Sequence, residues 1–132
     1  MFTITADPIQ QRLNITIKDF YDEEDLKSIC FMINGELKKL KNGWSAAVDL
    51  RGMRVLEQKL TKYIKRIQYT FLAHNVARVA TLVDNVILKM QIQRIGNETG
   101  CNDFTRRFNN EEAWLTYLST PPEINRSRSS TL

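Results

Sequence analysis

The sequence predicts an α/β protein with a single-layer β-sheet, mixed but mostly parallel, and about four helices. Two observations support the sheet: short N-terminal segments alternate apolar and polar residues, and later segments are continuous apolar runs bounded by turn residues. A third supports the helices, because apolar residues recur with the period of an α-helix between those runs. Helices that alternate with strands require crossover connections, which favour parallel strands.

The first part of the chain is expected to form two strands and a helix. Residues 2–5 and 13–17 alternate in polarity on either side of an Asp-Pro pair, so they form a hairpin or a loosely turned pair. The acidic residues 19–25 begin a helix, because negative charge stabilises a helix N-terminus, and an Asn-Gly pair at 42–43 ends it. Its apolar stripe consists of Leu26, Ile29, Cys30, Ile33, Leu37 and Leu40.

A buried strand near the middle of the chain organises the other elements. The apolar run 44–53 reads as a strand that ends in Asp49 and breaks at Gly52. The helix that follows has its buried face between residues 60 and 71. Residues 76–83 form the next buried strand.

The last elements continue this alternation. An Asp-Asn pair offers a cap for a third helix that runs through Ile95. Residues 103–108 form a short strand, and Asn109 or Asn110 caps a final helix over residues 111–118.

Length and composition predict one domain over residues 1–120, followed by a disordered tail over residues 121–132 that is rich in Ser and Arg. The net charge of +4 is too small to favour binding to nucleic acid. No apolar run approaches the roughly 20 residues that span a bilayer. The N-terminus lacks the features of a signal peptide, so the expected location is the cytoplasm.

The chain offers few residues that bind metals. Cys30 and Cys101 are far apart in the sequence, and His74 is the single histidine, so no Cys/His set can form a zinc site. We expect both cysteines to be free thiols in a reducing compartment, with no metal and no cofactor.

Three stretches resemble the SpoIIAA-like (STAS-like) family of small bacterial proteins. They are the strand and turn over residues 46–53, the strand that enters a helix over residues 78–85, and the final strand and helix over residues 104–115. The last stretch ends in Glu-Ala-Trp-Leu, similar to that family's closing helix. The resemblance covers residues 2–118 and implies a STAS fold, whose antagonists of anti-sigma factors are interaction domains.

The resemblance also locates a regulatory position. Those antagonists share the turn Asp-Ser-Ser-Gly, whose serine is phosphorylated by the partner kinase. Here Glu57 and Gln58 open the corresponding turn, and the nearest hydroxyl is that of Thr61. The resemblance therefore implies a module without the usual phosphorylation switch. Glu57 either imitates a charged state or is a favourable first-turn residue.

Residues that could support catalysis are scarce. Asp49 and Asp84 follow neighbouring candidate strands, so they are expected at one rim of the sheet, as a pair of carboxylates or as caps of turns and helices. His74 is expected to complement the end of the second helix rather than to transfer protons. The sequence contains no nucleophile elbow and no phosphate-binding loop, and we expect no enzyme.

Apolar residues on helix surfaces suggest binding. Phe31 and Met32 fall outside the stripe of the first helix. The third helix has two apolar sides, so it is either sunk in the core or covered by a partner. The members of its two stripes are Val86, Ile87 and Met90 on one side and Leu88, Ile92 and Ile95 on the other. The basic residues of the second helix are either solvated or meet an acidic partner.

These observations leave two main functional hypotheses and a weaker third. The first is a non-enzymatic STAS-like module for protein interaction or regulation, expected to be a homodimer, with a protein partner also possible. Its candidate contact residues are Phe31, Met32, Leu88, Met90, Ile92 and Ile95. The alternative is a carrier of a small apolar or amphipathic, lipid-like ligand in a pocket under the third helix, lined by Met90 and Trp114. An enzyme that uses Asp49, Asp84 or His74 is third.

Overall fold

The computed structural model describes residues 1–19 and 22–122. Its elements in chain order are β1 (Phe2–Asp7), β2 (Arg12–Ile17), α1 (Glu23–Leu37), β3 (Ser45–Asp49), α2 (Thr61–Ala73), β4 (Arg78–Leu82), α3 (Val86–Thr99), β5 (Thr105–Phe108) and α4 (Glu111–Ser119). Two short 3₁₀ turns, Gln58–Leu60 and Cys101–Phe104, precede α2 and β5. The predicted tail lies, from residue 123 onward, outside the described residues.

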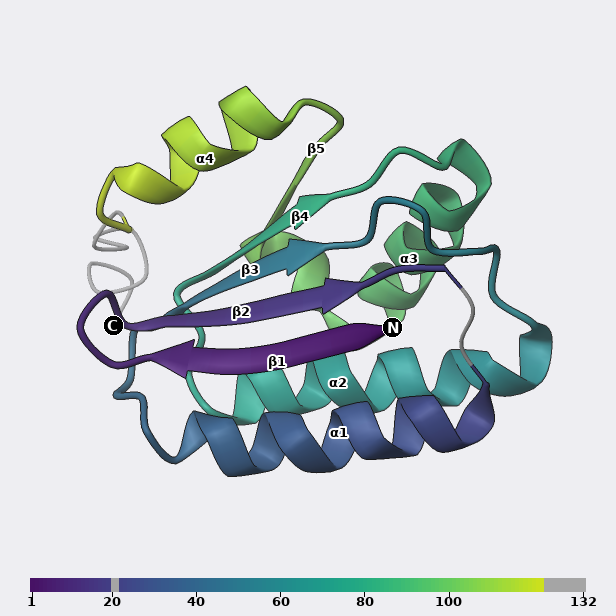
Figure 1. Ribbon diagram of the computed structural model, residues 1–132, viewed down its shortest axis with the longest axis horizontal. Helices are drawn as coiled ribbons and strands as arrows, with labels where there is room; N and C mark the ends of the chain where they lie inside the picture. Colours follow the sequence, from purple (N-terminus) through teal and green to yellow (C-terminus); the bar gives the residue numbers. More distant parts are fainter. Residues whose placement is uncertain (20–21, 123–132) are drawn as a thin grey trace.

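The sheet has five strands in the order β1-β2-β3-β4-β5 (Figure 1). β1 and β2 form the antiparallel pair, and all the other neighbours are parallel. This arrangement confirms the predicted α/β fold with a mixed, mostly parallel sheet and four helices. Each crossover leads to the adjacent strand, so α1, α2 and α3 cover the same face of the sheet.

Local capping determines where the helices begin and end. α1 begins later than predicted because Asp22 caps it: its carboxylate accepts from the Asp25 backbone at 2.9 Å, and the Asp25 carboxylate accepts in return at 3.0 Å. α3 runs four residues beyond the predicted Ile95 and ends at Gly100, whose φ of +86° suits glycine. Asn110 caps α4 by accepting from the Ala113 backbone at 2.9 Å.

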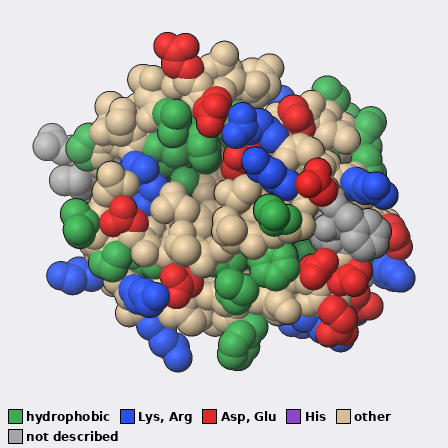
Figure 2. Space-filling model, in the orientation of Figure 1, with side chains coloured by type: hydrophobic (Ala, Val, Ile, Leu, Met, Phe, Trp, Pro, Cys, Tyr) green, Lys and Arg blue, Asp and Glu red, His purple; other side chains and the backbone are tan. Residues whose placement is uncertain are grey.

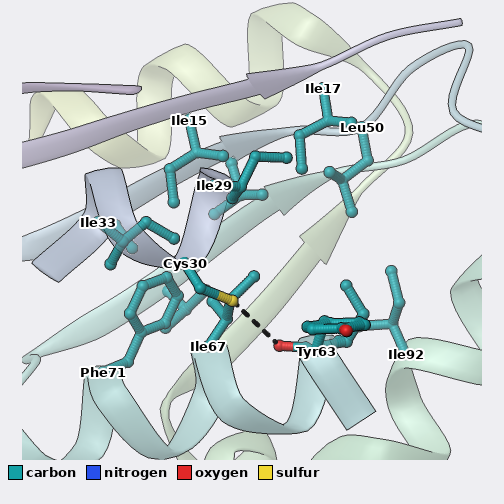
Figure 3. Close-up of a cluster of buried hydrophobic side chains, with 14 of the residues drawn as sticks. Ile15, Ile17, Ile29, Cys30, Ile33, Leu50, Tyr63, Ile67, Phe71 and Ile92 are labelled. Carbon is teal, nitrogen blue, oxygen red and sulfur yellow. Dashed lines mark hydrogen bonds between the residues drawn. The ribbon is translucent and has the colours of Figure 1, made fainter. Parts of the chain in front are cut away.

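The main core lies between the sheet and the first three helices. Figure 3 shows side chains of β2, such as Ile15, pointing at α1, whose Ile33 in turn faces Phe71 of α2. The strand β3 is buried at all five positions, as the apolar run predicts. Before it, Trp44 is 1% exposed and donates its indole N–H to the His74 carbonyl at 2.7 Å. Cys30 and Cys101 are buried free thiols.

The opposite face of the sheet carries α4, which lies across β4 and β5 (Figure 1). Its contact consists of a small apolar cluster: Ala47, Ala80, Phe108, Trp114, Tyr117 and Leu118. Trp114 donates its indole N–H to the Ala80 carbonyl at 2.9 Å. The prediction that Trp114 lines a space under α3 is therefore wrong, since the sheet separates the two.

Among the described residues, no helix combines the length and the apolar character that a membrane crossing requires.

Candidate functional site

The carboxyl ends of β3, β4 and β5 meet at one rim of the sheet, where open α/β sheets usually bind ligands. Asp49 and Asp84 both lie at this rim, as predicted, but each has a separate partner. Asp49 is 6% exposed and receives two bonds from the Arg51 guanidinium, Nε to Oδ1 at 3.0 Å and Nη2 to Oδ2 at 2.8 Å. Asp84 accepts from the Gly52 backbone at 3.3 Å.

The environment of Asp49 keeps it ionised. Burial raises the pKa of its carboxyl, but the hydrogen bonds and the charge of Arg51 outweigh burial, and the pKa lies below its ordinary value. Arg51 Nη2 also lies 3.4 Å from Glu111, so the same guanidinium links the rim to α4. A paired carboxylate with a lowered pKa is a poor general base near neutral pH.

This ion pair predicts a pH-dependent contribution to stability. An Asp with a lowered pKa stabilises the fold above its unfolded pKa of about 3.9, and the contribution disappears as the pH falls through the folded pKa. We expect Arg51→Gln to lower the free energy of unfolding by about 1 kcal/mol at pH 7, allowing for the partial exposure of Arg51, and to have a smaller effect at pH 3, below the unfolded pKa of Asp.

Urea denaturation at the two pH values checks this expectation. Lys59→Gln is the control, because Lys59 and Glu57 are 3.8 Å apart with both side chains 69% exposed, and the change should be small at either pH. An equal loss at pH 7 and pH 3 for Arg51→Gln would contradict the assignment to Asp49.

The residues at the predicted switch position lie at an exposed turn before α2. Glu57 precedes the 3₁₀ turn, makes no side-chain cap, and receives a backbone hydrogen bond from Leu60 at 2.9 Å. Gln58 is exposed, and its carbonyl accepts from the Thr61 hydroxyl at 2.8 Å. The position is accessible, but the nearest hydroxyl is engaged with the local backbone.

The structure separates the two apolar stripes of α3. Leu88, Ile92 and Ile95 are at most 8% exposed and belong to the main core. They cannot contact a partner in the folded chain, so the hypothesis that they form a binding surface is wrong for these three. The other stripe consists of Val86, Ile87 and Met90, which are 68%, 55% and 55% exposed.

A neighbouring loop extends this exposed stripe. The Gln91 side chain accepts from the Leu56 backbone N–H at 2.8 Å and donates to the Leu56 carbonyl at 2.9 Å, which holds the loop against α3. Val55, next to Leu56, is 44% exposed. We call Val55, Val86, Ile87 and Met90 the α3 patch. Figure 2 shows hydrophobic side chains over the first turns of α3, at the upper right.

The other predicted contact residues lie on α1. Phe31 is 81% exposed and Met32 37%, in agreement with their position outside the apolar stripe. α2 packs against both α1 and α3, so these two residues do not join the α3 patch. They form a separate, smaller apolar surface.

A cleft of about 290 Å³ opens at the same rim, between the N-terminal ends of α3 and α4. Lys89 of α3 and Arg107 of β5 line it. Arg107 Nη2 donates to the Asn102 side chain, and burial lowers the pKa of the Arg107 guanidinium below its ordinary value. Its Nε is buried and has no hydrogen-bond partner within the described part of the chain.

A second cavity lies inside the core and measures about 60 Å³. Ile92 lines it, as do apolar residues of β2, β3 and α2, whereas Met90 is on the outer surface of α3. Pockets that hold drug-sized ligands measure about 300–1,000 Å³. The cavity is too small for a lipid-like ligand, so the arrangement does not favour a carrier.

The basic face of α2 is largely neutralised. Lys65 pairs with Glu98 at 2.7 Å, and Lys62 lies 3.9 Å from Glu23. His74 Nδ1 lies 2.9 Å from the Thr70 carbonyl at the end of the helix, the location expected for a residue that complements a C-terminus.

Sequence reasoning missed Lys89, Arg107 and Val55. One signal was present for Arg107: it alternates with Thr105 in a short strand, so both side chains point to the inner face, where a charged residue is unusual. No comparable signal existed for Val55, because the position of its loop against α3 depends on the hydrogen bonds between Leu56 and Gln91.

The fold and the rim define a class, a small α/β protein with a mixed five-stranded sheet and four helices. Comparison with models of protein families and with curated proteins found no match.

Proposed function

We propose that this protein is a non-enzymatic, STAS-like interaction module that forms a homodimer through the α3 patch. The family resemblance of residues 2–118 and the succession of strands and helices support the STAS-like assignment. The paired state of Asp49 argues against acid–base chemistry at the rim.

The observation that carries the proposal is the exposure of the α3 patch. Scattered apolar side chains on a surface are ordinary, but here three lie within five residues of one helix and a fourth lies on the loop bonded to it. Solvating these side chains is unfavourable, and a partner that covers them removes that cost. The patch contains four side chains, fewer than the roughly 20–30 residues that each partner contributes to a standard interface, so polar neighbours complete the contact.

A second copy of the chain is a suitable partner because the surroundings of the patch carry both charges. Asp84 and Lys89 are exposed, and they lie on either side of Val86 and Ile87 in the sequence. A two-fold dimer brings the same surfaces together, so the apolar residues of one copy cover those of the other. The expected interface is therefore apolar at its centre and charged at its rim, with groups of both signs exposed there.

The test compares two lysine substitutions at exposed positions. Ile87→Lys places a charge in the patch, whereas Phe31→Lys makes the same kind of change on α1. Both variants should fold, as judged by circular dichroism. We expect sedimentation equilibrium to show a dimer of the unmodified protein, and Ile87→Lys to raise the dissociation constant at least about tenfold, equivalent to about 1.4 kcal/mol. Phe31→Lys should leave it unchanged.

Two results would oppose the proposal. An unmodified protein that stays monomeric at millimolar concentration would exclude the homodimer. Equal weakening by Ile87→Lys and Phe31→Lys would exclude the α3 patch as its interface.

A further inference from the structure

The cleft at the rim is built from segments that both follow parallel strands. β4 leads into α3 and β5 leads into α4, and the cleft of about 290 Å³ lies between these two connections. Such a position is where open α/β sheets bind small molecules, because side chains and helix N-termini from two connections converge there. The cleft is therefore the best-placed concave surface for a ligand in the described part of the chain.

Two cations line the cleft without acidic partners. Neither Lys89 nor Arg107 has a carboxylate within 4.0 Å among the described residues, whereas Lys62 and Lys65 on α2 each have one. Arg107 uses Nη2 to bind the neutral Asn102 side chain, so no acidic group offsets its charge. An anionic group in the cleft would offset the charges of both side chains.

The backbone of α3 adds to this positive potential. The first turn of α3 has no acidic residue, while that of α4 contains Glu111 and Glu112. The first N–H groups of a helix lack intrahelical acceptors and carry partial positive charge. Asn85 satisfies the Leu88 N–H at 3.0 Å, which leaves the earlier N–H groups of that turn without an intrahelical acceptor, and Asn85 and Val86 line the cleft. The backbone and the two cations therefore favour the same sign of ligand charge.

We propose that the cleft binds a small oxyanion, one phosphate or carboxylate group, between Lys89 and Arg107. Its volume lies at the lower limit for ligand pockets, which suits a small molecule. Asp84 also lines the cleft and repels a ligand with negative charge throughout. A small molecule with one anionic group, held at the Lys89 and Arg107 end of the cleft, fits the volume and keeps its charge away from Asp84.

Isothermal titration at constant ionic strength tests this site, with inorganic phosphate in one series and acetate in the other. Lys89 is exposed, so Lys89→Gln should fold normally, and we expect it to raise the dissociation constant at least tenfold. Asp84→Asn keeps an oxygen for the Gly52 N–H but removes the repelling charge, so it should tighten binding severalfold. Lys59→Gln makes the same charge change at an exposed position outside the cleft, and it should leave the affinity unchanged.

Binding of phosphate alone, or of acetate alone, would identify which group the cleft accepts. Absence of binding in both series would overturn the inference, as would equal weakening by Lys89→Gln and Lys59→Gln. Repeating the titration with Ile87→Lys separates this site from the proposed dimer: the site predicts binding by the monomer as well. An affinity that disappears with the dimer would instead assign the anion to the interface and overturn a site within one chain.

Discussion

Replacing Arg78 with alanine is expected to lower the free energy of unfolding by about 3 kcal/mol and to weaken the attachment of α4 to the sheet. Arg78 is 7% exposed and donates hydrogen bonds to Ser45 Oγ at 2.9 Å and to three carbonyls at the end of α4. Those carbonyls belong to Tyr117, Leu118 and Thr120, at 3.1, 3.2 and 2.7 Å. The guanidinium also lies 4.9 Å from the centre of the Tyr117 ring.

The physical reason is that the buried cation Arg78 makes most of the side-chain hydrogen bonds to the C-terminal end of α4, with one more from Arg12 to the Leu118 carbonyl at 2.8 Å. The last carbonyls of a helix have no intrahelical donors and carry partial negative charge. Burial lowers the pKa of Arg78 from its ordinary value, yet an arginine stays charged in a folded protein. Loss of Arg78 leaves the Thr120 carbonyl without a donor, while the Tyr117 and Leu118 carbonyls keep only the Thr120 hydroxyl and the Arg12 guanidinium. Because the apolar contact of α4 is small, this loss weakens the attachment of the helix.

Arg106 provides a matched control on the neighbouring strand. Its guanidinium lies 5.3 Å from the Tyr117 ring centre, but the side chain is exposed. Arg106→Ala should therefore cost less than about 1 kcal/mol. Urea denaturation measures both losses, and hydrogen exchange reports the protection of α4. Equal losses for the two variants, or full protection of α4 in Arg78→Ala, would contradict the role assigned to Arg78.

Replacing Gly96 with alanine should destabilise the protein by about 2 kcal/mol, although alanine is the better helix former. A Cβ at Gly96 would overlap the Asn102 amide, whose Cγ would be 2.6 Å away. Asn102 is held in place: its Nδ2 donates to the Gln93 carbonyl at 2.9 Å and to Asn97 Oδ1 at 2.6 Å, and its oxygen accepts from Arg107. The new methyl group therefore breaks several hydrogen bonds or strains the turn.

Gly35 is the control, since it lies in α1, is exposed, and has no atom within 4 Å of an added Cβ. Gly35→Ala should stabilise the protein by about 0.5–1 kcal/mol through helix propensity alone. Thermal or urea unfolding of the two variants should show changes of opposite sign. A stabilised Gly96→Ala would mean that Asn102 moves away at little cost.

The elements themselves were largely predictable because their signals are local. Alternation revealed β1 and β2, and the continuous apolar run before Asp49 revealed β3. Helix ends were less predictable, because they depend on particular caps. Residues near Asp22 and Asn110 have similar side chains that could also cap a helix. Only the backbone conformation decides which side chain accepts a hydrogen bond from a free N–H of the first turn.

The candidate site was predictable only in part. Parallel strands end at the same edge, so the common location of Asp49 and Asp84 follows from the element order. The hydrogen bonds between the Asp49 and Arg51 side chains do not follow from the element order, because they require a turn that folds the chain back within two residues. Lys89 lies on a helix and Arg107 on a strand, and tertiary packing brings them to the same cleft. The local sequence around each residue does not indicate that the other lies nearby.

The sequence alone determined the fold class, the order of the strands and helices, and the presence of two apolar stripes on α3, since these depend on residue periodicity. The tertiary structure decided which stripe is buried and on which face of the sheet α4 lies. The physical reason is that both stripes of α3 are equally hydrophobic in isolation. One of them enters the core only because the connection from β4 to α3 orients the helix. α4 lies on the other face of the sheet, where Arg78 donates hydrogen bonds to carbonyls at its C-terminal end.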